Sequence, residues 1–72
     1  MATIRKALKT VREQNKMTQE QVAVHLGIKV RAYQNIEYGK ALGSIKHWDR
    51  LEDLFGIPQR SLREITTDKV IK

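Results

Sequence analysis

Between Val30 and Tyr38 the chain carries hydrogen-bonding side chains at helical spacing. Arg31 and Asn35 are four residues apart, and Gln34 and Tyr38 repeat that interval. In a helix these four residues share one broad face. Guanidinium and carboxamide groups can form two parallel hydrogen bonds with a planar partner. The chemistry offered by this face is therefore recognition of a hydrogen-bonding surface and not bond making.

No group of residues in the sequence has the composition of a catalytic or metal site. The chain has no cysteine, which excludes thiolate ligands and disulfides. His25 and His47 are isolated, and neither serine at positions 44 and 61 has a general base or a glycine elbow beside it. The acidic residues Asp49, Glu52 and Asp53 fit a solvated helix face. We expect no enzyme activity, no metal and no cofactor.

The formal net charge of +6 is concentrated in the first part of the chain. Residues 1–40 hold eight Lys/Arg and three Glu, for a net charge of +5. A basic field of this kind suits a polyanion such as nucleic acid, or an anionic membrane surface. A net charge of this size also keeps a small domain soluble, so charge by itself leaves these interpretations open.

The apolar residues follow helical spacing along the whole chain, which predicts an all-α fold. We expect the 72 residues to form one domain (residues 1–72) with a small core. Asn15 is expected to end the first helix in a left-handed conformation, and residues 66–72 are expected to be a frayed tail. The fourth helix is expected to bury Ile45, Trp48, Leu51, Leu54 and Phe55. The five predicted helices cover about 3–14, 19–26, 30–38, 45–55 and 58–65.

The stretch from Thr18 to Ile28 has the features of a tight connection between two crossing helices. Thr18 and Gln21 have the spacing of a capping box, so a helix is expected to begin there. Ala23 is small enough for another helix to cross it closely, and Gly27 accepts the positive φ of a sharp turn. Ile28 then fills the space under the turn. Together these features predict a helix-turn-helix formed by the second and third helices.

In such a motif Tyr33 and Ile36 face inward, and the opposite side of the third helix faces out. A helix fits the major groove of DNA, where Arg and Asn match the edges of guanine and adenine, and Val can meet a thymine methyl. The turn and the charge together favour double-stranded DNA over an ordinary solvated face. Tyr33 is expected to be half buried, with its hydroxyl toward phosphate. The residues expected to read bases are Val30, Arg31, Gln34 and Asn35.

Three motifs in the sequence resemble the phage Cro and lambda-repressor-type helix-turn-helix domains, the XRE family. They are QEQVAVHLG over residues 19–27, IEYG over residues 36–39 and LEDLFGI over residues 51–57. The resemblance covers roughly residues 4–65. It implies a compact five-helix domain that regulates transcription as a Cro-like repressor. It also implies symmetric dimers that bind an inverted-repeat operator.

The resemblance assigns roles to individual residues. Those matching Val30, Arg31 and Asn35 read bases, those matching Gln19 and Lys40 touch phosphate, and the start of the fourth helix approaches phosphate. The family usually has Ser or Thr where this chain has Lys29, which loses a helix cap but adds a charge near phosphate. The residues expected to contact phosphate are Gln19, Lys29, Tyr38, Lys40, Ser44 and Lys46.

Glu37 requires a cationic neighbour. A carboxylate in the last turn of a helix faces the negative end of the helix dipole, and it would also repel DNA. Arg12 is the expected partner, and the family resemblance implies the same pair. We interpret Arg12 and Glu37 as a structural ion pair.

The sequence leaves two other classes of function open. The fold is compatible with a protein-interaction module or an antitoxin-type partner protein. Outward apolar residues on the third helix would favour this class of function. The first helix is also basic enough to contact an anionic membrane. Its basic residues are Arg5, Lys6, Lys9, Arg12 and Lys16.

Partners and location follow from the same features. Spare apolar residues from Ile57 to Ile65 are expected to form a weak homodimer that DNA completes. No small-molecule effector is expected, because no sensing domain is evident. The N-terminus lacks the apolar run of a signal peptide, and no segment reaches membrane-spanning length. We therefore expect a cytoplasmic protein, bacterial or phage-encoded, that is nucleoid-associated when bound to DNA.

Overall fold

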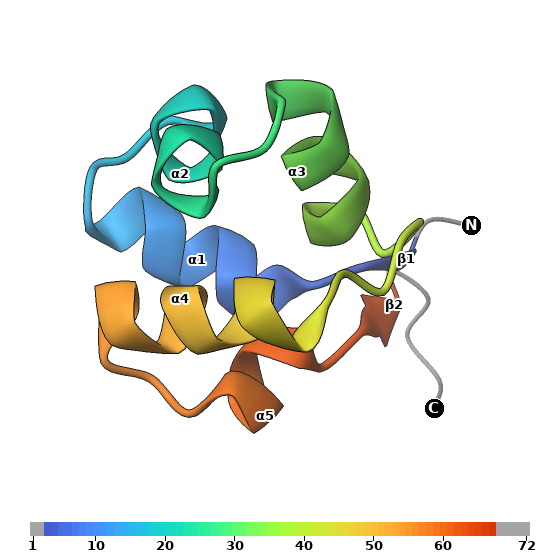
Figure 1. Ribbon diagram of the computed structural model, residues 1–72. Helices are drawn as coiled ribbons and strands as arrows, with labels where there is room; N and C mark the ends of the chain where they lie inside the picture. Colours follow the sequence, from blue (N-terminus) through green and yellow to red (C-terminus); the bar gives the residue numbers. More distant parts are fainter. Residues whose placement is uncertain (1–2, 68–72) are drawn as a thin grey trace.

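The computed structural model describes residues 3–67 and contains five helices in that range (Figure 1). The two short strands β1 (Thr3–Ile4) and β2 (Thr66–Thr67) pair antiparallel, with Thr3 opposite Thr67 and Ile4 opposite Thr66. The predicted all-α fold is confirmed, and the strand pairing is a small addition to it. The helices are α1 (Lys6–Gln14), α2 (Gln19–Leu26), α3 (Val30–Glu37), α4 (Ile45–Phe55) and α5 (Gln59–Arg63).

Two of the helices begin at capping boxes. The Thr18 side chain accepts a hydrogen bond from the Gln21 backbone N–H, and the Gln21 side chain accepts one from the Thr18 N–H, as the sequence predicts for α2. Ser44 and His47 form the corresponding reciprocal pair at the start of α4. Each box satisfies backbone N–H groups that have no partner inside the helix. These local bonds fix where both helices start.

The start of α1 differs from the sequence prediction. The helix begins at Lys6 and not near Thr3, because Thr3 and Ile4 are used in strand pairing. Both are β-branched residues, which favour extended backbone over helix. Their partners Thr66 and Thr67 belong to the segment that the sequence predicts to be a frayed tail, so this prediction is wrong for these two residues. The rest of the predicted tail, residues 68–72, lies outside the described residues.

The end of α1 also differs from the prediction. Lys16, and not Asn15, takes the left-handed conformation, with φ of 56°. Asn15 keeps φ at −89°, and its side-chain Nδ2 donates a 2.8 Å hydrogen bond to the Val11 carbonyl. Asn15 therefore ends the helix without adopting positive φ, and its side chain adds a second hydrogen bond to a carbonyl that already accepts from the Asn15 backbone N–H at 3.1 Å.

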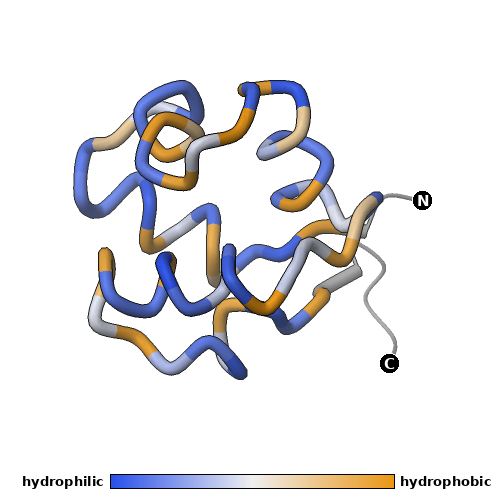
Figure 2. Tube along the Cα trace, in the orientation of Figure 1, coloured by the Kyte–Doolittle hydropathy of each residue, from blue (hydrophilic) through white to orange (hydrophobic). Residues whose placement is uncertain are grey.

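Every helix contributes to one small core. Figure 2 shows hydrophobic residues recurring among hydrophilic ones along the helices, and each helix buries at least one of its apolar residues in the core. α1 packs against α3 and α5, and α4 packs against α2 and α5. The buried apolar residues are Leu8, Val22, Ala23, Leu26, Tyr33, Ile36, Trp48, Leu51 and Leu62.

No helix within residues 3–67 has the length and apolar character needed to cross a membrane.

Two expectations about apolar residues are wrong. Ile45 was expected in the core, but it is 78% exposed. It is the first residue of α4, and helical side chains tilt toward the N-terminus, so its side chain projects past the packed part of the helix. Leu62 was expected to fold back on the core and is fully buried there, so the further expectation that it is available for dimer contact is wrong; Ile57 also packs against the core.

Candidate nucleic-acid interface

α2 and α3 form a tight two-helix unit, as the sequence predicts. Gly27 ends α2 in the left-handed conformation, with φ of 72°, and the next residue, Ile28, donates its backbone N–H to the Ala23 carbonyl at 3.1 Å. Ala23 itself is buried in the core, and α2 and α3 pack against each other. The turn and the close crossing hold α3 at a fixed angle to α2.

The two sides of α3 differ in character. Tyr33 and Ile36 are buried in the core, and Arg31 on the opposite side is exposed. Gln34 and Asn35 are half buried at the border between these sides. Val30 is also half buried and packs against the core, so only part of its side chain faces outward. α3 therefore presents Arg31 most openly.

Gln19, expected at phosphate, uses its side chain inside the protein. Its Nε2 donates to Oε2 of Glu37 at 3.0 Å and to the Tyr38 hydroxyl at 3.2 Å, and its Oε1 accepts from Nε2 of Gln34 at 3.1 Å. Both N–H bonds of the carboxamide are thus committed to α3 and the residue after it. Gln19 is the first residue of α2, so its backbone N–H has no partner within the helix.

Glu37 lies at the centre of a buried hydrogen-bond network beneath this surface. Its carboxylate accepts from Nε of Arg12 at 2.8 Å and from Nη2 of Arg12 at 3.2 Å, and the Tyr33 hydroxyl donates to it at 2.8 Å. Arg12 also donates from Nη1 to the Met17 carbonyl at 2.8 Å. Glu37 is fully buried, so these donors replace the water that a carboxylate would otherwise bind. The network joins α1, α2 and α3.

The pKa shifts in this network follow from burial and charge. The hydrogen bond to Glu37 raises the pKa of Arg12, which keeps the guanidinium charged. Burial raises the pKa of the Tyr33 phenol, and the adjacent Glu37 carboxylate raises it further. The Tyr33 ring is fully buried and its hydroxyl donates to Glu37. The expectation that this hydroxyl reaches toward phosphate is therefore wrong.

The connection after α3 carries one exposed basic residue, Lys40, and is held by backbone hydrogen bonds. The backbone N–H groups of Lys40 and Ala41 both donate to the Asn35 carbonyl, at 2.8 Å and 3.0 Å. Lys40 is exposed there, and Lys29 is exposed at the other end of α3. At the start of α4, Ser44 and Lys46 are exposed as well. Positive charge thus flanks α3 at both ends.

Arg5 is one of the five basic residues of the first helix that the sequence suggests for membrane contact, but it is buried. It is only 2% exposed, and its guanidinium donates to the carbonyls of Ile36, Ala41 and Arg63. Burial lowers the pKa of Arg5, and the charge of nearby Arg63 lowers it further. Arg12 is also buried, so two of the five basic residues invoked for membrane contact are unavailable to a membrane. No local pattern identifies Arg5, because its three carbonyl partners lie 31 to 58 residues away.

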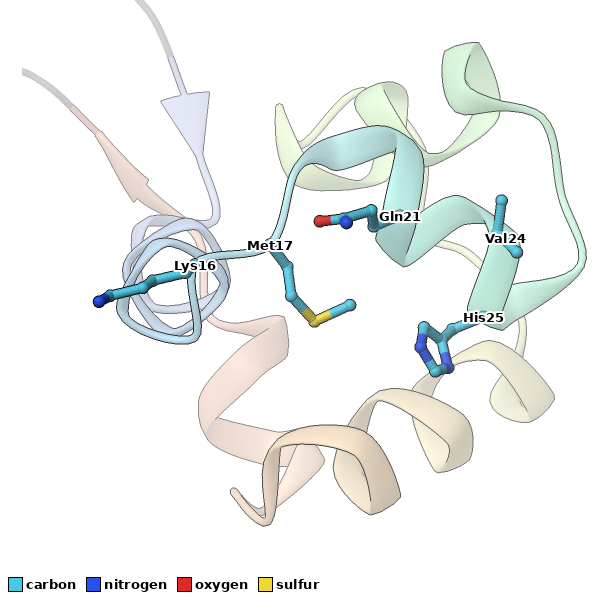
Figure 3. A pocket seen from close by; sticks show the side chains of 5 residues that line it. All are labelled: Lys16, Met17, Gln21, Val24 and His25. Carbon is cyan, nitrogen blue, oxygen red and sulfur yellow. The ribbon is translucent and has the colours of Figure 1, made fainter.

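A shallow surface pocket opens beside α2, and none of the residues expected to contact DNA lines it (Figure 3). Its lining comes from the α1–α2 turn and from the face of α2 that carries Gln21, Val24 and His25. Gln19, which bonds to Gln34 of α3, is not among the residues that line this pocket. Within residues 3–67 no three His, Asp or Glu side chains gather closely enough to hold a metal ion.

Comparison with known proteins agrees with this geometry. A family model described as helix-turn-helix matches residues 8–71, which is most of the chain. No curated protein and no solved structure gives a significant match. The matched range includes the α2–α3 unit, the connection after it and α4. The chain belongs to the Cro/C1-type helix-turn-helix family, the XRE family, and is a DNA-binding transcription regulator.

Proposed function

We propose that this regulator is a Cro-like repressor that places α3 in the major groove of an operator. The observation that carries this proposal is the exposed Arg31 face of α3, held rigidly by the α2–α3 turn and flanked by the exposed cations Lys29 and Lys40. A helix inserted in the groove has phosphates beyond both of its ends, so this arrangement of charge complements DNA.

Base reading is assigned to the outer side of α3. Arg31 can bind a guanine edge with two hydrogen bonds, and Asn35 can bind an adenine edge in the same way. Contact with a thymine methyl is assigned to Val30, whose side chain is half buried and leaves a part exposed for it. Gln34 shares its amide with Gln19, so its contribution to base reading depends on its Oε1 and on its second N–H.

Phosphate contact is assigned to residues on both sides of α3. The side-chain amide of Gln19 is used internally, so its contact comes from the backbone N–H at the start of α2, where the helix dipole favours an anion. The Tyr38 hydroxyl accepts from Gln19, which leaves its own proton free for a phosphate oxygen. The exposed side chains that complete the set are Lys29, Lys40, Ser44 and Lys46.

Two copies are expected to bind one inverted repeat. One α3 covers few base pairs, so a second copy about 34 Å away, one helical turn along DNA, increases both affinity and specificity. Five large apolar residues of the described chain are exposed: Val24, Tyr38, Leu42, Ile45 and Ile65. Such a surface supports weak association that DNA completes.

Selection of duplexes from a random pool tests the proposal. We expect wild-type protein to enrich an inverted repeat with a defined half-site, at a salt concentration of about 0.15 M where non-specific binding is weak. Enrichment without a common half-site would contradict base reading by α3. Failure to retain any duplex would instead favour a protein-interaction or antitoxin-type role for the fold.

A further inference from the structure

Four carbonyls, two in the last turn of α3 and two in the connection that follows it, receive hydrogen bonds from outside the helix. Nη1 of Arg5 donates to the Ile36 carbonyl and, at 2.9 Å, to the Ala41 carbonyl. The Arg5 backbone N–H donates to the Glu37 carbonyl at 2.9 Å. The indole Nε1 of Trp48 donates to the Leu42 carbonyl at 2.8 Å. The connection from α3 to α4 is therefore fixed by two side chains from distant parts of the sequence.

These two side chains also contact each other. The Arg5 guanidinium lies over the Trp48 ring, with 5.2 Å between its central carbon and the ring centroid. Such stacking orients the planar guanidinium while leaving its N–H groups free to donate at the edge. Gly43 lies against the same indole, since a Cβ atom at that position would be 3.2 Å from Trp48 Nε1 and 3.3 Å from Ile36 Cδ1. We define Arg5, Trp48 and Gly43 as the loop clamp.

The location of the guanidinium has an electrostatic reason. The last carbonyls of a helix are unpaired and carry partial negative charge, which a cation stabilises. α3 has no basic residue in its own last turn. Arg5 supplies the cation from the segment between β1 and α1, and its Nε also holds the Arg63 carbonyl at 3.0 Å, at the end of α5. Both ends of the described chain thus meet at the end of α3.

We propose that Arg5 is a positioning residue for DNA binding, because it holds the α3–α4 connection so that Lys40 keeps a fixed place relative to the base-reading face of α3. This inference rests on the proposed function, which assigns Lys40 to phosphate. Lys40 and Ala41 share the Asn35 carbonyl, so a displacement of Ala41 moves Lys40 with it. Arg5 itself is buried and touches no DNA.

Arg5→Lys is the variant that isolates positioning from charge. Lysine keeps the positive charge, but a single ammonium group on a flexible stem can neither stack as a plane nor reach all three carbonyls. In samples shown to be folded by circular dichroism, we expect affinity for the selected operator to fall about tenfold, the effect of losing one hydrogen bond to a charged group. The slope of log affinity against log salt should fall by about 1, and the preferred half-site should not change.

Two comparisons make the test specific. Arg60→Lys makes the same chemical change at an exposed position on α5 and should leave affinity and slope unchanged. In a Lys40→Ala background, Arg5→Lys should cause no further loss of slope, because the contact that it positions is already gone. Folded Arg5→Lys protein with wild-type affinity and slope would overturn the proposal, and so would fully additive effects with Lys40→Ala.

Trp48→Phe provides a second test if Arg5→Lys does not fold. Phenylalanine keeps an aromatic ring in the core but removes the N–H that holds the Leu42 carbonyl. The same loss of affinity and slope is expected, and wild-type binding by folded Trp48→Phe protein would overturn the loop clamp. Wild-type protein that selects no operator refutes the proposed function, whereas selective wild-type binding with unaffected variants refutes only this inference.

Discussion

Arg31 and Asn35 are the residues at which one substitution should change which DNA sequence is preferred. A bidentate contact to a base edge contributes about 1–3 kcal/mol of discrimination against the wrong base. Replacing either residue by Ala should therefore flatten the preference at one or two positions of each half-site and leave non-specific binding largely intact. Selection from a random pool measures this directly. Arg60→Ala, at an exposed position on α5, is the control, and unchanged preference in both α3 variants would refute their role as base readers.

Lys40 should behave differently, because a phosphate contact carries no sequence information. Lys40→Ala should weaken binding to selected and scrambled duplexes by the same factor. The slope of log affinity against log salt should fall by about 1, since one fewer counterion is released. Affinities measured over a range of salt concentrations test this. A loss confined to the selected duplex would move Lys40 to the base-reading set.

At the scale of the elements, Arg12 and Glu37 connect α1 to α3. Their side chains are 11% and 1% exposed, so removing one leaves the other charge in a poorly solvated site. We expect Arg12→Ala or Glu37→Ala to lower the free energy of unfolding by about 3–5 kcal/mol. The double variant should lose clearly less than the two single losses combined. Additive losses in denaturant unfolding would show that the pair is not coupled.

Tyr33 makes the same network sensitive to alkaline pH. The pKa of its phenol is raised in the folded state, so folding favours the neutral form. In the unfolded state the phenol ionises at about pH 10. Its contribution to stability is present below that pH and is lost as the pH rises above it. Wild-type stability should therefore fall more steeply between about pH 9 and 11 than that of Tyr33→Phe. Equal slopes in wild type and Tyr33→Phe would contradict this effect of Tyr33.

The elements that sequence predicts well are those whose boundaries depend on local bonds. The Thr18 capping box involves residues three apart, and Gly27 needs only its own backbone freedom. The helix-turn-helix follows from these features. The ion pair of Arg12 and Glu37 spans 25 residues, and it could be expected because a carboxylate at that position needs a cation and because the family resemblance implies the same pair.

The features that sequence does not predict depend on distant partners. Arg5 resembles any basic residue near a helix start, and its burial becomes evident only when Ile36, Ala41 and Arg63 come together around it. The β1–β2 pairing joins residues more than 60 positions apart. The internal use of Gln19 likewise depends on where α3 places Gln34 and Tyr38. These contacts are set by tertiary packing, which local propensity does not encode.

At the scale of the whole molecule, the small number of exposed apolar residues limits how tightly two copies can associate. Of the apolar residues expected to form the dimer contact, Leu62 is buried and Ile65 is 46% exposed. We expect mostly monomer at low micromolar concentration, because the available apolar area is below that of stable interfaces. On an inverted repeat, binding should be cooperative. Sedimentation without DNA and titration onto one or two half-sites test this, and a tight dimer without DNA, or equal affinity per half-site in both duplexes, would contradict it.

The central claim is sequence-specific recognition of double-stranded DNA by α3, and the ratio of two dissociation constants tests it most directly. The constants are those of the wild-type protein for its selected inverted repeat and for a scrambled duplex of the same length and composition, measured at the same salt concentration. We predict that the selected duplex binds about a thousandfold more tightly, as in specific protein–DNA complexes generally. Equal constants for the two duplexes would contradict the account.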